Sequence, residues 1–149
     1  MYSQILIAID GSELATRGLE QGLALAKALG SQVTILTASE PWTAMGVDAA
    51  GLVVTEYSLL DAYEKDAAKA GEVLLRAAAA AADNAGVKAK TVYTALTHPA
   101  DAIIDLAEKS GAELIVMASH GRRGIQRVVL GSQTAEVVTR STVPVLVVR

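Results

Sequence analysis

Ile5-Leu6-Ile7-Ala8-Ile9, followed at once by Asp10-Gly11-Ser12, is the stretch that decides the fold. The first five residues are apolar on both of the faces that an extended strand presents. A strand of this kind is typical of a parallel sheet that is covered on both sides by helices. The polar residues that follow end the strand, and Ser12 is a suitable N-cap for a helix.

The rest of the chain repeats this alternation of apolar runs with segments of helical periodicity. Small and apolar residues recur at helical spacing after Ser12 until Gly30, which ends the helix. Pro99 is suited to the first turn of a later helix. The pattern predicts strands at residues 5–9, 33–38, 87–96, 114–118 and 143–148, helices at 15–29, 60–85, 99–107 and 132–140, and a loop or lid at 39–60. We therefore predict one α/β domain over residues 1–149, with an open sheet.

The composition excludes several classes of protein. Of the 149 residues, 52% are hydrophobic and 19% charged, which is too apolar for a disordered chain. The net charge of −3 argues against nucleic acid or an anionic membrane as a partner. The absence of cysteine excludes disulfides and thiolate metal sites. No segment approaches the roughly 18 consecutive apolar residues of a membrane helix, so we expect a cytoplasmic protein.

A candidate site follows from the expected sheet. Ligands of open α/β sheets bind beyond the carboxyl ends of the strands, which here means Asp10, Ala38 and the loop that starts at Ala118. Glycines let backbone N–H groups approach an anion, and a helix N-terminus adds the positive end of its dipole. The loop supplies both features, and it also contains the chain's only adjacent arginines. Its relevant residues are Gly121, Arg122, Arg123, Gly131 and Ser132.

Asp10 has two possible roles in this arrangement. Its carboxylate could accept hydrogen bonds from a ribose or from an adenine amine. Alternatively, Asp10 and Ser12 merely cap the first helix. Trp42, in the 39–60 segment, could cover an adenine or could pack on the long helix.

Known catalytic motifs are not matched. There is no Gly-Lys-[Ser/Thr] of a P-loop, and the first strand is not followed by a dinucleotide-binding Gly-x-Gly-x-x-Gly turn. Asp10 lacks the second acidic neighbour that a phosphoacceptor domain needs for Mg²⁺. Ser119 and His120 are adjacent in the chain, so we expect that they do not easily form the Ser–His hydrogen bond of a catalytic triad. The two histidines, His98 and His120, are too few to predict a metal site. We therefore assign no catalytic residue and expect slow or negligible hydrolysis of a bound nucleotide.

The sequence resembles the universal stress protein family along essentially its whole length. The resemblance is carried by residues 5–12, by residues 114–121, and by Gly131-Ser132 with residues 144–148. It implies a Rossmann-like parallel sheet of five strands in the order 3-2-1-4-5, with helices on both faces. It also implies a homodimer that pairs through the last strand, Val143 to Val148.

Nucleotide-binding members of that family carry the motif Gly-x2-Gly-x9-Gly-[Ser/Thr]. Gly121, Gly131 and Ser132 match it, whereas Ala118 stands at the first glycine. An alanine there costs little unless the backbone needs a positive φ. The implied ligand is ATP or AMP, with Mg²⁺ as a candidate companion ion. By the same resemblance, the implied site contains Asp10 for ribose and adenine, Ala38 for the base, the backbones of Ala118, His120, Gly121, Gly131, Ser132 and Gln133, and nearby Arg122 and Arg123.

Two functions of different class follow from these observations. The first is a stress-response regulatory protein that binds an adenine nucleotide. The second is a dimeric stress or scaffold protein that binds no nucleotide and has a vestigial crevice. The match at Gly121, Gly131 and Ser132 favours the first function.

Overall fold

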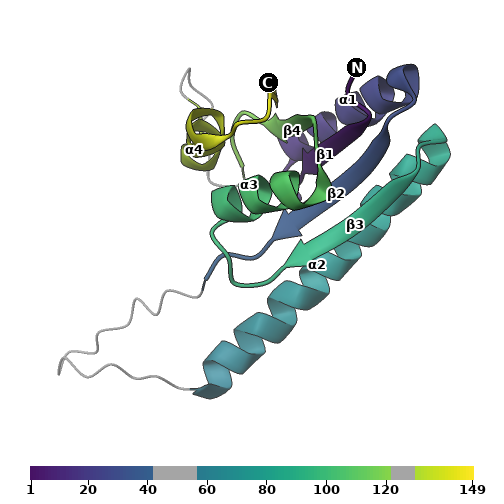
Figure 1. Cartoon of the computed structure of the whole chain (residues 1–149). Helices are drawn as coiled ribbons and strands as arrows, with labels where there is room; N and C mark the ends of the chain where they lie inside the picture. The colour runs from purple at the N-terminus through teal and green to yellow at the C-terminus, as the bar shows by residue number, and fades with distance from the viewer. Residues whose placement is uncertain (42–56, 122–129) are drawn as a thin grey trace.

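The computed structural model describes residues 1–41, 57–121 and 130–149. Strands and helices alternate along the chain in the predicted order (Figure 1). The elements are β1 (Gln4–Ala8), α1 (Glu13–Leu29), β2 (Gln32–Ala38), α2 (Tyr57–Ala85), β3 (Ala89–Thr94), α3 (Pro99–Ser110), β4 (Leu114–Ala118), α4 (Ser132–Arg140) and β5 (Val145–Val148). Within the described residues, no helix is both long enough and apolar enough to cross a membrane.

All five strands are parallel and lie in the order β3-β2-β1-β4-β5, as the resemblance implies. β1 is the central strand, and Ile7 pairs with Ile35 of β2 on one side and with Val116 of β4 on the other. After β1, the chain places β2 and β3 on one side of it and then returns to place β4 and β5 on the other side. This reversal puts the topological switch point at the carboxyl ends of β1 and β4.

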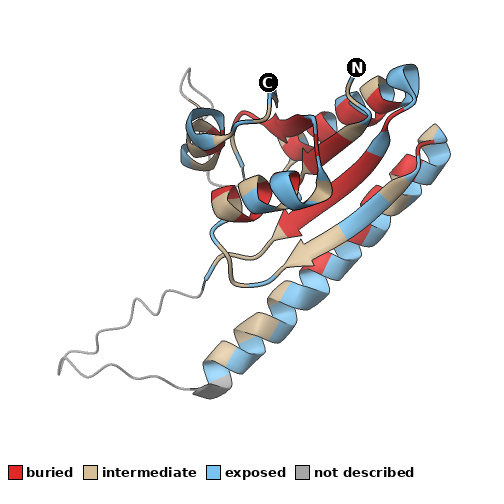
Figure 2. Cartoon of the chain, in the orientation of Figure 1, coloured by how far each residue is buried: buried red, intermediate tan, exposed pale blue. Residues whose placement is uncertain are grey.

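The sheet separates two apolar layers, and successive residues of β1 face opposite layers. Ile5 and Ile7 pack in the layer of α1 and α2, whereas Leu6 packs in the layer of α3. The three side chains are at most 1% exposed. Figure 2 shows that burial is concentrated in the central strands and on the helix faces turned toward them. A strand apolar on both faces is therefore explained by helices on both sides.

The predicted signals at the ends of α1 are confirmed. Ser12 Oγ accepts a hydrogen bond from the N–H of Ala15 at 3.1 Å, and Gly30 ends the helix with φ +69°. In the middle of α1, a Cβ on Gly22 would lie 2.6 Å from Ile7 Cδ1. Gly22 thus lets α1 lie close against the sheet.

Several predicted boundaries were wrong by a few residues. Residues 57–60 are the first turn of α2 rather than part of a loop; Trp42 and residues 43–56 lie outside the described residues. The third strand is shorter than 87–96, because the N–H of Val87 bonds to Ala82 O in the turn after α2 and Leu96 has a positive φ of 48°. The fifth strand begins at Val145 rather than Val143, whose N–H is bonded to Ser141 Oγ.

Candidate functional site

The predicted site residues at the ends of β1 and β4 lie side by side. Gly121, three residues after β4, is so close to Asp10 that a Cβ on Gly121 would overlap the Oδ2 atom of that carboxylate. Gly121 is exposed and Asp10 is partly buried. A Cβ at position 121 would therefore require the Asp10 carboxylate to move.

Asp10 orders the turn between β1 and α1. Its Oδ1 atom accepts a hydrogen bond from the N–H of Ser12 at 2.9 Å, and Gly11 between them has φ +82°. Ser12 is therefore confirmed as the N-cap of α1, whereas Asp10 orders the turn that precedes the helix. Because Oδ1 makes this bond while Oδ2 lies beside Gly121, the turn holds the carboxylate at the edge of the candidate site.

The first turn of α4 is attached to the end of β4. The N–H of Gly131 donates to Ser119 O at 2.8 Å, and the Thr134 hydroxyl donates to Ala118 O at 2.9 Å. The N–H of Ser119 in turn donates to Val148 O of β5 at 2.7 Å. These hydrogen bonds fix the N-terminus of α4 beside the carboxyl ends of two strands.

The N-terminus of α4 carries no side-chain cap among the described residues. Gly131 is the N-cap residue, and the first turn contains no acidic residue. The first N–H groups of a helix have no partner within the helix, and the helix dipole places partial positive charge there. The N–H groups of Ser132 and Gln133 belong to this first turn. The arrangement is suited to an anionic group.

Gly131 contributes by its size rather than by its N–H group, which is bonded to Ser119 O. A Cβ at this position would lie 3.0 Å from His120 Cα and 3.3 Å from Ser119 O. The close approach of these two segments therefore depends on glycine. Gly131 stays a predicted site residue, and its predicted role now depends on its lack of a side chain rather than on its N–H group.

Ala118 causes no backbone strain. Among the described residues, only Tyr2 and Leu96 have a positive φ without being glycine, and Ala118 is in strand conformation. It is 8% exposed and packs in the apolar layer of α1, where a Cβ on Gly18 would lie 3.7 Å from Ala118 N. The methyl group therefore fills the core beneath the site.

The expectation that Ser119 and His120 do not readily form a hydrogen bond was wrong. Ser119 Oγ lies 3.0 Å from His120 Nδ1. Consecutive side chains point apart in a strand, but the chain bends directly after Ala118, which brings these two together. Because Ser119 is 3% exposed, its hydroxyl is enclosed and unsuited to attack a substrate. The contact orders the loop and assigns no catalytic role.

Ser39 organises the adjacent edge of the sheet and was missed by sequence reasoning. It follows Ala38, which ends β2 beside Thr94 of β3. Ser39 Oγ accepts hydrogen bonds from Tyr93 Oη at 2.9 Å and from the N–H of Leu96 at 2.8 Å. A serine directly after a predicted buried strand was the available signal. Ser39 thus holds the turn that leads from β3 to α3.

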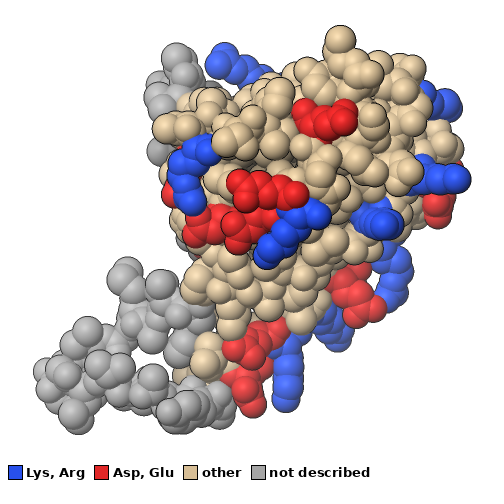
Figure 3. Space-filling model, in the orientation of Figure 1, with Lys and Arg blue, Asp and Glu red and all other residues tan. Residues whose placement is uncertain are grey.

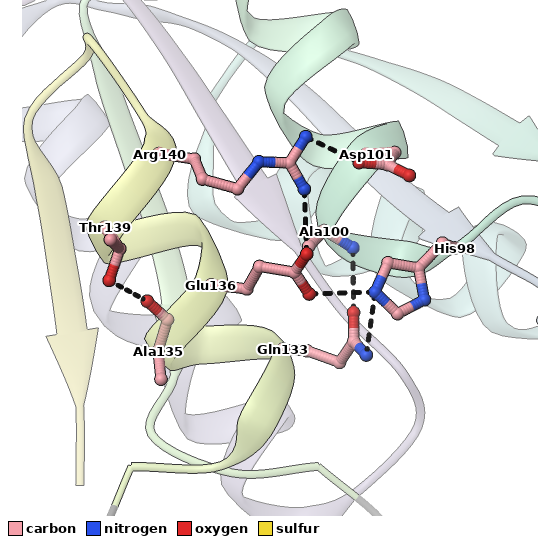
Figure 4. A network of polar contacts seen from close by, with 8 residues as sticks. All are labelled: His98, Ala100, Asp101, Gln133, Ala135, Glu136, Thr139 and Arg140. Carbon is pink, nitrogen blue, oxygen red and sulfur yellow. Dashed lines mark hydrogen bonds and ion pairs between the residues drawn. The ribbon is translucent and has the colours of Figure 1, made fainter.

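A polar network between α3 and α4 was also missed (Figure 4). Gln133 Oε1 accepts from the N–H of Ala100 at 2.9 Å, so the side chain of this predicted site residue points to α3. Glu136 contacts His98 Nε2 and Arg140 Nη1, each at 2.8 Å. The hydrogen bonds from His98 and Arg140 lower the pKa of the Glu136 carboxyl. Periodicity does not predict the contacts of His98 and Ala100 with α4, because they join residues that are 38 and 33 positions apart in the chain.

Two of the predicted site residues are not among the residues that the structure describes. Arg122 and Arg123 lie outside the described residues. Acidic and basic side chains are interspersed on the face shown in Figure 3. Within residues 1–41, 57–121 and 130–149, no three His, Asp or Glu side chains converge as metal ligands.

Comparisons with known proteins agree with this architecture. The model of the universal stress protein family matches residues 1–149. The universal stress protein YxiE of Bacillus subtilis is 33% identical over 149 residues, which is all of both chains. The solved structure of MJ0577 from Methanocaldococcus jannaschii has a TM-score of 0.82 at 24% identity and covers 99% of this chain and 96% of its own. A universal stress protein solved in complex with cAMP has a TM-score of 0.69 at 26% identity, covering 99% and 97%. The chain belongs to the universal stress protein family.

Proposed function

We propose that this protein binds an adenine nucleotide, ATP or AMP, at the carboxyl ends of β1 and β4 and acts as a stress-response regulator. The observation that carries the proposal is the first turn of α4, which has no acidic residue and no side-chain cap from the described residues while being fixed to Ala118 and Ser119 at the end of β4. The structural relative solved with cAMP supports an adenine nucleotide as the ligand.

Each part of the site has a role in this proposal. The phosphates would accept hydrogen bonds from the N–H groups of Ser132 and Gln133, as anions do at other helix N-termini. Asp10 would accept from the ribose hydroxyls, and the end of β2 at Ala38 would contact the base. Gly121 and Gly131 would keep the phosphate approach free of side chains.

Mg²⁺ would enter this site with the nucleotide. In the part of the chain that the structure describes, no three acidic or histidine side chains converge. Mg²⁺ commonly keeps several waters and binds through the phosphates of its nucleotide. We therefore place Mg²⁺ on ATP phosphates rather than in a protein site, and we expect binding with slow or negligible hydrolysis.

A homodimer through β5 is the second part of the proposal. β5 is one edge of the sheet and consists of apolar residues, with Leu146 37% exposed. The opposite edge strand, β3, carries exposed Lys90. Charged residues on an edge strand oppose pairing with another chain, whereas an apolar edge invites it. A Leu146→Glu variant should sediment as a monomer at a concentration where the wild type is a dimer; equal sedimentation would refute this interface.

The nucleotide proposal is tested by direct binding. Mass spectrometry of ligand released from the purified protein should find an adenine nucleotide, and calorimetry should detect ATP binding at sub-millimolar concentration. Gly131→Val should abolish this binding, because the added side chain meets the His120 backbone. Gly111→Ala is a control for loss of stability alone, since a side chain at its positive φ is strained but meets no neighbouring atom. Absence of ligand and of calorimetric binding in the wild type would favour the scaffold function.

A further inference from the structure

The N-terminus of α3 receives its cap from a different helix. His98 is the N-cap residue of α3 but makes no side-chain capping hydrogen bond. Pro99 has no N–H group, so the N–H of Ala100 is the first in the helix that needs a partner. Gln133 Oε1, on the first turn of α4, accepts that hydrogen bond at 2.9 Å.

The geometry also fixes how Gln133 and His98 are oriented. Glu136 Oε2, a carboxylate acceptor, lies 2.8 Å from His98 Nε2, so Nε2 carries the hydrogen. Gln133 Nε2 lies 3.4 Å from the same nitrogen, and two donors do not bond to each other. The amide of Gln133 is therefore held by its oxygen on Ala100, and its nitrogen only packs beside the imidazole.

A second pair of contacts joins the same two helices. Arg140 lies 2.7 Å from Asp101 of α3 and 2.8 Å from Glu136 within α4. We call His98, Ala100, Asp101, Gln133, Glu136 and Arg140 together the α3–α4 clasp (Figure 4). The clasp starts at the second residue of α4, in the turn whose N–H groups form the proposed phosphate site. One residue, Gln133, thus belongs to both.

We propose that Gln133 is a positioning residue, whose side chain holds the first turn of α4 against α3 so that its N–H groups stay aligned with the phosphate site. The inference rests on the proposed nucleotide binding and deepens it. In this role the side chain does not touch the ligand. Groups fixed before binding lose less entropy when the ligand arrives, so loss of the clasp lowers affinity.

The first test is Gln133→Met, which keeps the length of the side chain and removes the acceptor. ATP affinity measured by calorimetry should fall about tenfold, the scale on which outer partners of binding groups act. Glu72→Gln is the control, because Glu72 and Arg76 form an i,i+4 pair on α2, away from the clasp. Unchanged ATP affinity in Gln133→Met, with normal binding by the wild type, would overturn the inference and leave the proposed function intact.

A double variant separates positioning from stability. His98→Ser gives α3 an N-cap of its own. Gln133→Met should also lower the Tm, and in the His98→Ser/Gln133→Met protein the new N-cap should recover part of that loss, although the contact between His98 and Glu136 is lost as well. ATP affinity should stay low, because the first turn of α4 still lacks its hydrogen bond to Ala100. Recovery of affinity together with stability would show that Gln133 acts only through the stability of α3, and would overturn the positioning role. If the wild type binds no nucleotide at all, both the proposed function and this inference fail.

Hydrogen exchange gives an independent readout. Binding that orders the first turn of α4 must also favour the clasped state of α3, because coupling between two sites is reciprocal. ATP should therefore slow amide exchange at Ala100 in the wild type. The effect should be absent in Gln133→Met, measured at the same fraction of bound protein. Equal slowing in both proteins would contradict the coupling.

Discussion

Helices α1 and α4 follow the neighbouring strands β1 and β4, and both begin at the carboxyl end of the sheet. Their N-termini nevertheless differ chemically. α1 is closed by its own residues: Ser12 Oγ accepts from Ala15, and Glu13 places a negative charge in the first turn. α4 has Gly131 as its N-cap residue, with no acidic residue in its first turn and no side-chain cap from the residues that the structure describes.

The side chains at the two N-termini also make different hydrogen bonds. Ser12 satisfies an N–H group of its own helix, whereas Thr134 of α4 donates to the carbonyl of Ala118 in β4. α4 is therefore attached to the sheet without its N–H groups being capped by a side chain of the described chain. The comparison shows that two helices at the same end of the sheet can differ in whether a side chain caps their first N–H groups. What distinguishes α4 is that it is fixed in place while no side chain in the described ranges caps its positive end.

Gly131→Asp would give α4 the kind of cap that α1 has, and the largest effect is expected here. An aspartate at the N-cap accepts from the first N–H groups of the helix and repels phosphate, and its Cβ would also press on His120. We expect the Kd for ATP to rise at least about 100-fold, equivalent to about 2.7 kcal/mol. Calorimetry of Gly131→Asp beside Gly131→Ala checks this. An equal loss in both variants would show that only the added bulk matters.

Thr134→Val tests whether the attachment of α4 matters. The exchange keeps the shape but leaves the buried Ala118 carbonyl without its 2.9 Å hydrogen bond. We expect a loss of about 1–3 kcal/mol in the free energy of unfolding, the usual cost of an unsatisfied buried group, together with weaker ATP binding. Urea denaturation and calorimetry measure the two effects. Lowered stability with unchanged ATP affinity would separate the attachment from the site.

Ser12→Ala makes the matching change in α1. Loss of the N-cap should cost about 1 kcal/mol of unfolding free energy. ATP affinity should change little, because the capped N-terminus of α1 has no proposed ligand contact. A drop in ATP affinity as large as that of Thr134→Val would remove the distinction between the two helices. The same denaturation and binding measurements apply.

Glu136→Gln should have the smallest effect, and it depends on pH. Because hydrogen bonds from His98 and Arg140 lower the pKa of folded Glu136, its ionised form stabilises the fold above the ordinary glutamate pKa. That contribution is lost as pH falls through the lowered pKa. The Tm difference between wild type and Glu136→Gln should therefore be present at pH 7 and shrink below about pH 4.3, the ordinary glutamate value. Glu72→Gln is the control, and a constant difference down to pH 3 would contradict this role of Glu136.

The sequence determined the fold more completely than the site. Apolar runs such as residues 5–9 and 114–118 gave the central strands to within one residue, because a buried parallel strand is apolar on both faces. Ends set by hydrogen bonds between distant segments were placed less well. The third strand stops early where Leu96 turns with a positive φ and bonds to Ser39 of another loop.

Candidate site residues were predicted where the signal in the sequence was local. Gly121 was predicted because it follows a strand, and Gly131 because it precedes a helix. The sequence did not show that the N–H of Gly131 donates to Ser119 O. It also did not reveal that Gln133 caps α3, because that contact spans 33 residues and needs the two helices to be adjacent. Such contacts follow from tertiary packing, which a periodicity argument does not contain.

An NMR titration of the ¹⁵N-labelled protein with ATP tests the central claim most directly. The account predicts that the backbone amides of Ser132 and Gln133 show the largest shifts, that AMP produces smaller ones, and that the capped amide of Ala15 in α1 stays nearly unchanged. Saturable ATP binding that leaves the Ser132 and Gln133 amides unmoved, or moves α1 instead, would contradict it.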